Sequence, residues 1–129
     1  MAVEIGVAVL AAERAPVETI DTLDELVAAL DLTLDNFPDY RHLDVRLHVG
    51  LAEATASSRL ITAMTEVQGE MTSLISLIAH PPEVLDSSND QHRRLLGAIR
   101  RRDEASAARE MAEHLRGTEH VLGGLLPKS

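Results

Sequence analysis

Residues 41–54, RHLDVRLHVGLAEA, are the stretch that most directly predicts the fold. Its apolar residues recur at the spacing of one helix face, beginning one residue earlier: Tyr40, Leu47, Leu51 and Ala54. This period indicates an amphipathic helix with one side toward a core. Asp44 and His48, four residues apart, fall on that same side. A carboxylate and an imidazole that point inward one turn apart must have a binding partner in the interior.

The rest of the chain carries the same helical period. Phe37 and Tyr40 are the only aromatic residues, and β-branched residues are scattered, which favours helices over sheets. Pro16, the sequence Asn36-Phe37-Pro38 and the sequence Pro81-Pro82 interrupt the pattern. The expected helices cover about 2–14, 17–32, 39–55, 58–79, a segment opened by 87–90, and 104–122. Short connections between amphipathic helices predict an all-α fold, an antiparallel bundle of about six helices, in a single domain over residues 1–129.

Composition excludes several classes of protein. The chain has no cysteine, and therefore neither disulfides nor a thiolate zinc site. No apolar run approaches the roughly 20 residues that span a bilayer, and the run near Glu4 predicts a core helix, so we expect a cytoplasmic protein without membrane contact. The net charge is −9, and the basic cluster 100–102 falls where a helix should end. We therefore expect no direct binding of nucleic acid by this chain.

Two further histidines lie on apolar faces of other predicted helices. His92 precedes Leu95, Leu96 and Ile99, and His114 lies between Met111 and Val121. With Asp44 and His48, three helices thus direct metal-type ligands toward the interior. Carboxylate and neutral imidazole suit a divalent ion such as zinc, nickel or manganese, and four such ligands leave positions for water or a small carboxylate. His120 is a poorer candidate ligand.

Other interpretations remain open at this stage. The histidines can be hydrogen-bonded core residues, and Asp44 and His48 can pair with each other and face a dimer partner. A di-iron site is disfavoured because no histidine has Glu three residues before it. A metal-dependent enzyme needs a general base, and no additional inward carboxylate is evident, since Glu66 and Glu70 flank the apolar stripe of helix 58–79.

The ordered motifs resemble a known family. Asp44-Val45-Arg46-Leu47-His48 is followed by Ala52-Glu53-Ala54, then by the segment from His92 to Ile99 with Asp103, and then by Ala108, Met111, His114 and Leu115. Together with Glu4 and Ala11-Ala12-Glu13-Arg14, this pattern resembles the FCD domain, the all-helical effector-binding module of GntR-type bacterial transcription regulators of the FadR group. The resemblance covers almost the whole chain.

The resemblance implies a fold and a function. In metal-binding members the equivalents of Asp44, His48, His92 and His114 hold a divalent ion at the floor of a pocket, where a small organic acid ligates it. Binding then shifts a homodimer and alters the DNA affinity of an N-terminal winged helix-turn-helix domain, which is absent from this chain.

The chain also departs from the family pattern. Many members place arginines on the fourth helix to hold a ligand carboxylate, whereas this chain offers Thr65, Gln68 and Thr72. Arg41, one turn before Asp44, can supply that charge or be solvated. Ser57 stands where the family has Asn, and it can bind an effector or only cap the next helix. Three functions therefore compete: a ligand-sensing regulatory domain, a metal-dependent enzyme on small carboxylates, and a metal-free helical dimerisation module.

Overall fold

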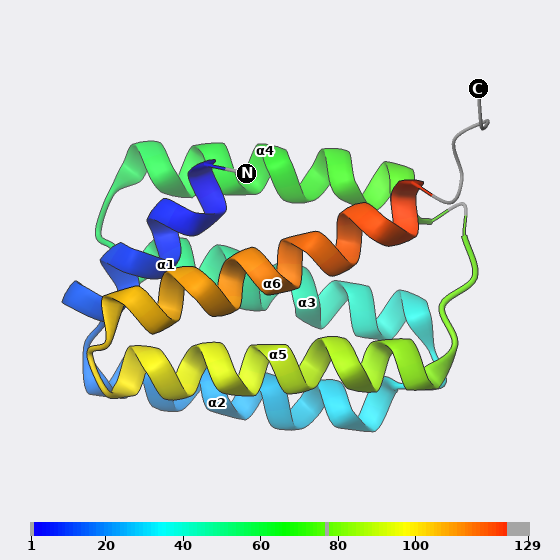
Figure 1. The fold of residues 1–129 in the computed structure, drawn as a ribbon, viewed down its shortest axis with the longest axis horizontal. Helices are drawn as coiled ribbons and strands as arrows, with labels where there is room; N and C mark the ends of the chain where they lie inside the picture. Colours follow the sequence, from blue (N-terminus) through cyan, green and yellow to red (C-terminus); the bar gives the residue numbers. More distant parts are fainter. Residues whose placement is uncertain (1, 77, 124–129) are drawn as a thin grey trace.

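The computed structural model describes residues 2–76 and 78–123, with side chains as far as Thr118. Within these ranges the chain forms six α-helices and one 3-10 turn and no strand, which confirms the predicted all-α bundle (Figure 1). The elements are α1 Ala2–Arg14, α2 Val17–Leu30, η1 Asp31–Thr33, α3 Phe37–Glu53, α4 Ser58–Ile75, α5 Pro82–Arg100 and α6 Glu104–Gly123.

Prolines lie in the first turn of α3 and α5, where the sequence pattern predicted interruptions. α5 begins at Pro82, so the prediction that residues 87–90 open it was wrong and placed the start at least five residues too late. A proline at the first helical position removes an N–H that has no partner there, and its fixed φ suits the helix. α3 begins at Phe37 rather than 39, because the Asn36 side chain accepts a hydrogen bond from the Asp39 N–H at 3.1 Å and caps it.

The core joins α1, α2, α3, α5 and α6, and α4 adds Met64 to it. α1 contributes small residues, and their size allows α6 to pack closely against it. Larger side chains from the other helices fill the interior. The fully buried side chains include Val7, Ile20, Leu23, Leu30, Leu47, Leu51, Met64, Leu96, Ile99 and Met111.

α4 is the least embedded helix of the bundle. It buries only Met64, Gln68 and Ile75, and it ends at Ile75 rather than at the predicted 79. The apolar stripe predicted for this helix is only partly inside, because Leu74 is 53% exposed. α4 packs mainly on α3. Its buried Gln68 therefore meets Arg41, which α3 directs inward.

The basic cluster at the end of α5 has local partners. The Arg100 guanidinium binds Asp21 at 2.8 Å and Asp24 at 2.5 Å, both on α2. Arg101 caps the helix, and Arg102 adopts a positive φ of 60° that turns the chain into α6. The cluster therefore ends a helix and ties α5 to α2. Among the described residues, no helix has the length and apolar character needed to cross a membrane.

Candidate functional site

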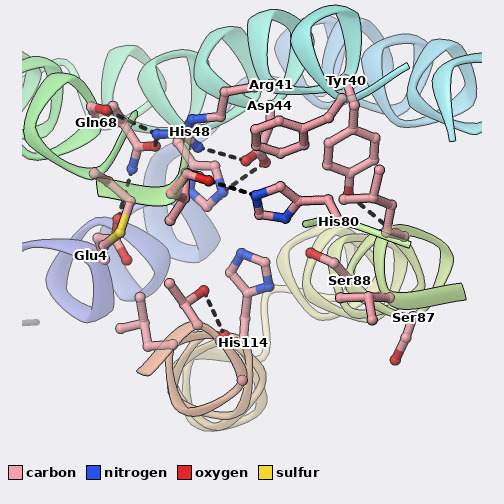
Figure 2. Close-up of a pocket in the computed structure, with 18 of the residues that line it drawn as sticks. Glu4, Tyr40, Arg41, Asp44, His48, Gln68, His80, Ser87, Ser88 and His114 are labelled. Atoms are coloured by element: carbon pink, nitrogen blue, oxygen red, sulfur yellow. Dashed lines mark hydrogen bonds and ion pairs between the residues drawn. The ribbon is translucent and has the colours of Figure 1, made fainter. Parts of the chain in front are cut away.

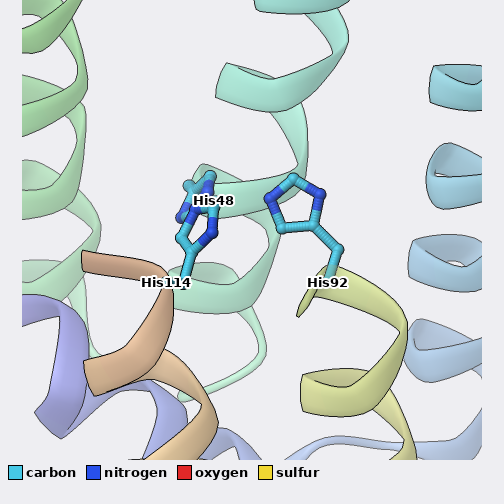
Figure 3. Close-up of side chains that lie close together, drawn as sticks. All are labelled: His48, His92 and His114. Carbon is cyan, nitrogen blue, oxygen red and sulfur yellow. The ribbon is translucent and has the colours of Figure 1, made fainter. Parts of the chain in front are cut away.

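Three helices bring histidines together at the centre of the bundle. His48 comes from α3, His92 from α5 and His114 from α6, and Figure 3 shows their rings converging. One nitrogen from each ring lies within 4.8 Å of the other two. The exposed fraction is 2% for His48, 1% for His92 and 9% for His114. Their meeting point is therefore shielded from solvent.

Asp44 lies one turn before His48 and faces the same point. Its Oδ1 atom is 3.3 Å from His48 Nε2 and 3.2 Å from His92 Nε2. Two ligands that each lie about 2.1 Å from one divalent ion are about 3 Å apart when their bonds are perpendicular. These separations therefore fit the coordination of a single ion by Asp44, His48 and His92.

Several polar atoms of this cluster have no hydrogen-bond partner. Among the described residues, four buried side-chain atoms are unpaired: Glu4 Oε2, Asp44 Oδ1, His48 Nδ1 and His92 Nε2. Buried polar atoms are rarely left without a partner, because the loss of hydration costs about 1–3 kcal/mol. Unpaired Asp44 Oδ1 and His92 Nε2, only 3.2 Å apart, match the lone pairs that a metal ion would accept.

Two amides hold the imidazole rings in position. Asn89 donates through Nδ2 to the carbonyl oxygen of Val27, so its Oδ1 accepts a hydrogen bond from His92 Nδ1–H at 3.0 Å. Gln91 Oε1 accepts one from His114 Nδ1–H at 2.9 Å. Both arrangements leave the Nε2 lone pair facing the cluster, as metal-binding histidines require. Neither amide was predicted from the sequence, although Asn89 lies one turn before His92 on the same apolar face of α5.

The charges of the cluster are coupled. Burial by itself raises the pKa of Asp44. The charge of His48 and the short contacts to His48 and His92 outweigh burial, so the pKa lies well below its usual value. Burial lowers the pKa of His92, and it lowers that of His114 strongly. Burial also lowers the pKa of His48, but Asp44 outweighs this effect and the pKa is raised. The lowered pKa values of Asp44, His92 and His114 favour the protonation states that metal ligands need, whereas the raised pKa of His48 favours its protonated form, so His48 would release a proton when an ion binds.

A cavity of about 330 Å³ opens beside the cluster (Figure 2). Asp44, His48 and His114 contribute to its polar wall. Phe37, Met71, Ile75, Val84 and Leu115 supply its apolar part. Its volume and mixed lining are those of a site for a small molecule.

The candidate effector-binding residues have different positions. Arg41 and Gln68 line the cavity. Thr72 is half-buried, and its Oγ1 accepts a hydrogen bond from Arg41 Nε at 2.9 Å. Ser57 is not among the lining residues; its hydroxyl accepts from the Leu60 N–H and caps α4. Thr65 is exposed and bonds only to its own helix, so it does not face the cavity.

Arg41 is held by the protein rather than solvated. It is 6% exposed, and its Nη1 donates to Asp44 Oδ2 at 2.7 Å. Its Nη2 donates to the backbone oxygen and to Oε1 of Gln68, at 2.9 Å and 3.0 Å. With the bond to Thr72, four of the five N–H groups of this guanidinium have partners. Arg41 therefore orients Asp44 and has little remaining capacity to bind a ligand.

Glu4 is an inward carboxylate that the sequence analysis did not recognise. The expectation of no additional inward carboxylate was wrong, because Glu4 is 3% exposed and lines the cavity. Its Oε1 accepts a hydrogen bond from Gln68 Nε2 at 2.7 Å. The sequence offered one signal for this position. Glu4 is an acidic residue in an apolar stretch of α1, between Val3 and Ile5, and the structure buries it.

The cavity wall also includes His80, which lies between α4 and α5, and Tyr40 of α3. His80 stacks on Phe37 with ring centroids 3.6 Å apart, and its Nε2 contacts the Ile75 oxygen at 2.7 Å. Tyr40 donates its hydroxyl to the Leu85 oxygen at 3.2 Å. His80 and Tyr40 thus both contribute to the cavity wall. The side chain of His120, the poorer candidate ligand, lies outside the described residues.

Comparisons with known proteins agree with this architecture. A family model described as FCD domain matches residues 1–117. Streptococcus agalactiae GntR superposes with a TM-score of 0.78 at 23% identity, over 92% of this chain and 53% of that protein. E. coli McbR/YncC gives a TM-score of 0.87 at 16% identity, over 95% of this chain and 60% of that protein. The chain thus spans little more than half of either protein, and these likenesses concern the fold. Curated protein sequences gave no match.

Proposed function

The chain belongs to the FCD domain family, and we propose that it is the effector-sensing domain of a GntR/FadR-type transcription regulator. It binds a divalent metal, zinc, nickel or manganese, through Asp44, His48, His92 and His114. A small organic acid binds in the adjoining cavity. The observation that carries this proposal is the convergence of three buried histidines, two of which lie within 3.3 Å of the unpaired Oδ1 of Asp44.

Each residue of the cluster has a role in this proposal. A bound divalent ion supplies positive charge and open ligand positions for a carboxylate. Asp44 and the three histidines hold it, Asn89 and Gln91 fix two of the rings, and Arg41 orients Asp44. The apolar side chains around the cavity exclude water from the bound acid. No step of this scheme requires turnover.

Regulation follows from a shift of populations. We propose that the acid favours one arrangement of a homodimer in the cytoplasm, and that a separate N-terminal winged helix-turn-helix domain responds by changing its DNA affinity. The acidic chain itself, at net charge −9, makes no direct contact with DNA in this scheme. Light scattering of the purified chain, with and without metal, measures the oligomeric state on which the scheme depends.

The metal content of the purified chain tests the site. Plasma mass spectrometry of untagged protein should find about one divalent ion per chain, and little in a His92→Ala, His114→Ala double variant. A matched His42→Ala variant, which removes an exposed histidine from α3, should keep the metal. A parent protein that holds no metal after incubation with zinc, nickel and manganese would favour the metal-free dimerisation module instead.

One observation also favours a second function, metal-dependent hydrolysis. Glu4 places a buried carboxylate in the same cavity as the cluster, and a hydrolase uses such a group as general base for a metal-activated water. Turnover of small esters and amides by the metal-loaded protein, lost in Glu4→Gln, would support this function. Saturable binding of carboxylates without turnover supports sensing.

The amide of Asn89 should matter for metal affinity. Replacing Asn89 with alanine removes the acceptor that holds His92 Nδ1–H, and we expect metal affinity to fall about 10–100-fold. Competition with a chromophoric chelator measures this affinity. Asp90→Ala, which changes the exposed neighbour, is the matched control and should leave it unchanged. Equal affinity in Asn89→Ala and the parent would show that the His92 ring needs no such support.

A further inference from the structure

The unpaired oxygen of Glu4 defines a second recognition point in the cavity. Glu4 Oε1 is occupied by the Gln68 amide, whereas Oε2 is buried and has no hydrogen-bond partner among the described residues. Both Glu4 and the metal-site residues Asp44, His48 and His114 line the same cavity (Figure 2). A ligand held at the cluster therefore lies in the same cavity as the Glu4 side chain, whose Oε2 is the acceptor left without a partner.

The surroundings of Glu4 fix its role as an acceptor. Gln68 donates both of its amide hydrogens, to Glu4 Oε1 at 2.7 Å and to Met64 Sδ at 3.4 Å, and its Oε1 accepts from Arg41. Gln68 therefore cannot turn to offer a donor to a ligand. Oε2 accepts hydrogen bonds only, and it needs a donor to compensate for burial.

The remaining charges of the cavity disfavour a second ligand carboxylate. Arg41 is the one arginine among the described lining residues, and its charge is already paired with Asp44. Glu83, exposed in the same lining, adds another carboxylate. A dianionic ligand would bring its second carboxylate toward Glu4, and the described lining residues include no unpaired arginine or lysine to receive it. Like charges at short range repel strongly in a buried site.

We propose, as an extension of the function proposed above, that the effector is a monocarboxylate that also carries a hydrogen-bond donor, an ammonium or hydroxyl group. Its carboxylate binds at the Asp44–His48–His92–His114 cluster, and its donor binds Glu4 Oε2. Dicarboxylates are rejected by Glu4. Glu4 is then the residue that determines specificity, and it acts through charge and hydrogen bonding rather than through size.

A series of acids with the same carbon chain tests this proposal. Butyrate, γ-hydroxybutyrate, γ-aminobutyrate and succinate differ only in the group at the far end: methyl, hydroxyl, ammonium or carboxylate. Calorimetric titration into the zinc-loaded protein should give tighter binding of the hydroxyl and ammonium acids than of butyrate, by about tenfold, and weaker binding of succinate. The corresponding six-carbon series, with adipate as the dianion, covers a longer reach between the two groups.

The Glu4→Gln variant places a hydrogen-bond donor where the parent protein has the acceptor Oε2. Glutamine can keep the acceptor for Gln68 and places an NH₂ group where Oε2 lies, so the preference for the ammonium acid over the dicarboxylate should be lost or inverted. Glu70→Gln, which removes an exposed carboxylate from α4, should keep the parent ranking. Metal content and melting temperature of each variant show that the fold and the metal site persist.

The outcomes separate this inference from the function on which it rests. If the protein contains metal and binds the dicarboxylates of both series as tightly as the hydroxyl and ammonium acids, the role of Glu4 is overturned. The proposed sensing function is unaffected by that result. Metal present without binding of any acid overturns both the effector class and Glu4. Should Glu4→Gln fail to fold, the ranking of the acids in the parent protein still decides the proposal.

Discussion

Replacing Arg41 with leucine is expected to lower the free energy of unfolding of the metal-free protein by about 3 kcal/mol. The substitution leaves Asp44, 8% exposed, without the guanidinium that now binds Oδ2 at 2.7 Å. It also removes the donors to Gln68 and Thr72. Breaking a buried pair costs about 3–5 kcal/mol, and the lower end applies because His48 also compensates the charge of Asp44.

Urea denaturation of metal-free and zinc-loaded protein measures this effect. The loss should be smaller with zinc, because the ion compensates the carboxylate that Arg41 no longer binds. Arg46→Leu, an exposed arginine of the same helix, is the matched control and should change stability by less than about 0.5 kcal/mol. Similar stability of the two leucine variants would mean that Arg41 is not an internal support of the site, and would return it to the candidate effector ligands.

The sequence predicted the parts of this structure that depend on helical period. The inward placement of Asp44, His48, His92 and His114 follows from their positions among buried apolar residues, and all four are buried. The start of α5 was less predictable, because a proline pair can end one helix and also begin the next. Local sequence does not distinguish these two uses of proline.

The polar partners of the site depend on contacts between helices. Glu4 and Gln68 are 64 residues apart in sequence, and their hydrogen bond depends on the packing of α4 near α1. The participation of Gln91 likewise depends on its opposing His114 across the α5–α6 contact. Periodicity assigns a residue to a face of its own helix, but it does not identify the residue on the neighbouring helix that it meets.

Removing the metal is expected to lower the melting temperature of the parent protein by about 10 °C. A ligand that binds only the folded chain stabilises it by about 2.7 kcal/mol when its free concentration is 100 times the dissociation constant. For a domain of this length, 129 residues, each kcal/mol corresponds to about 4 °C. Differential scanning calorimetry of zinc-loaded and chelator-dialysed protein measures the shift, and re-addition of zinc should restore the higher temperature.

The His92→Ala, His114→Ala variant distinguishes metal binding from other effects of the chelator. Without two of the three histidines whose nitrogens lie within 4.8 Å of one another, this variant should melt at the same temperature with and without chelator. A chelator shift as large in the variant as in the parent would place the stabilising ion elsewhere on the chain. If chelator changes the melting temperature of neither protein, and neither contains metal, the buried histidines are core residues that bind no ion. The chain would then be better described as a metal-free dimerisation module, because the cavity would lack the positive charge of the ion that attracts an organic acid.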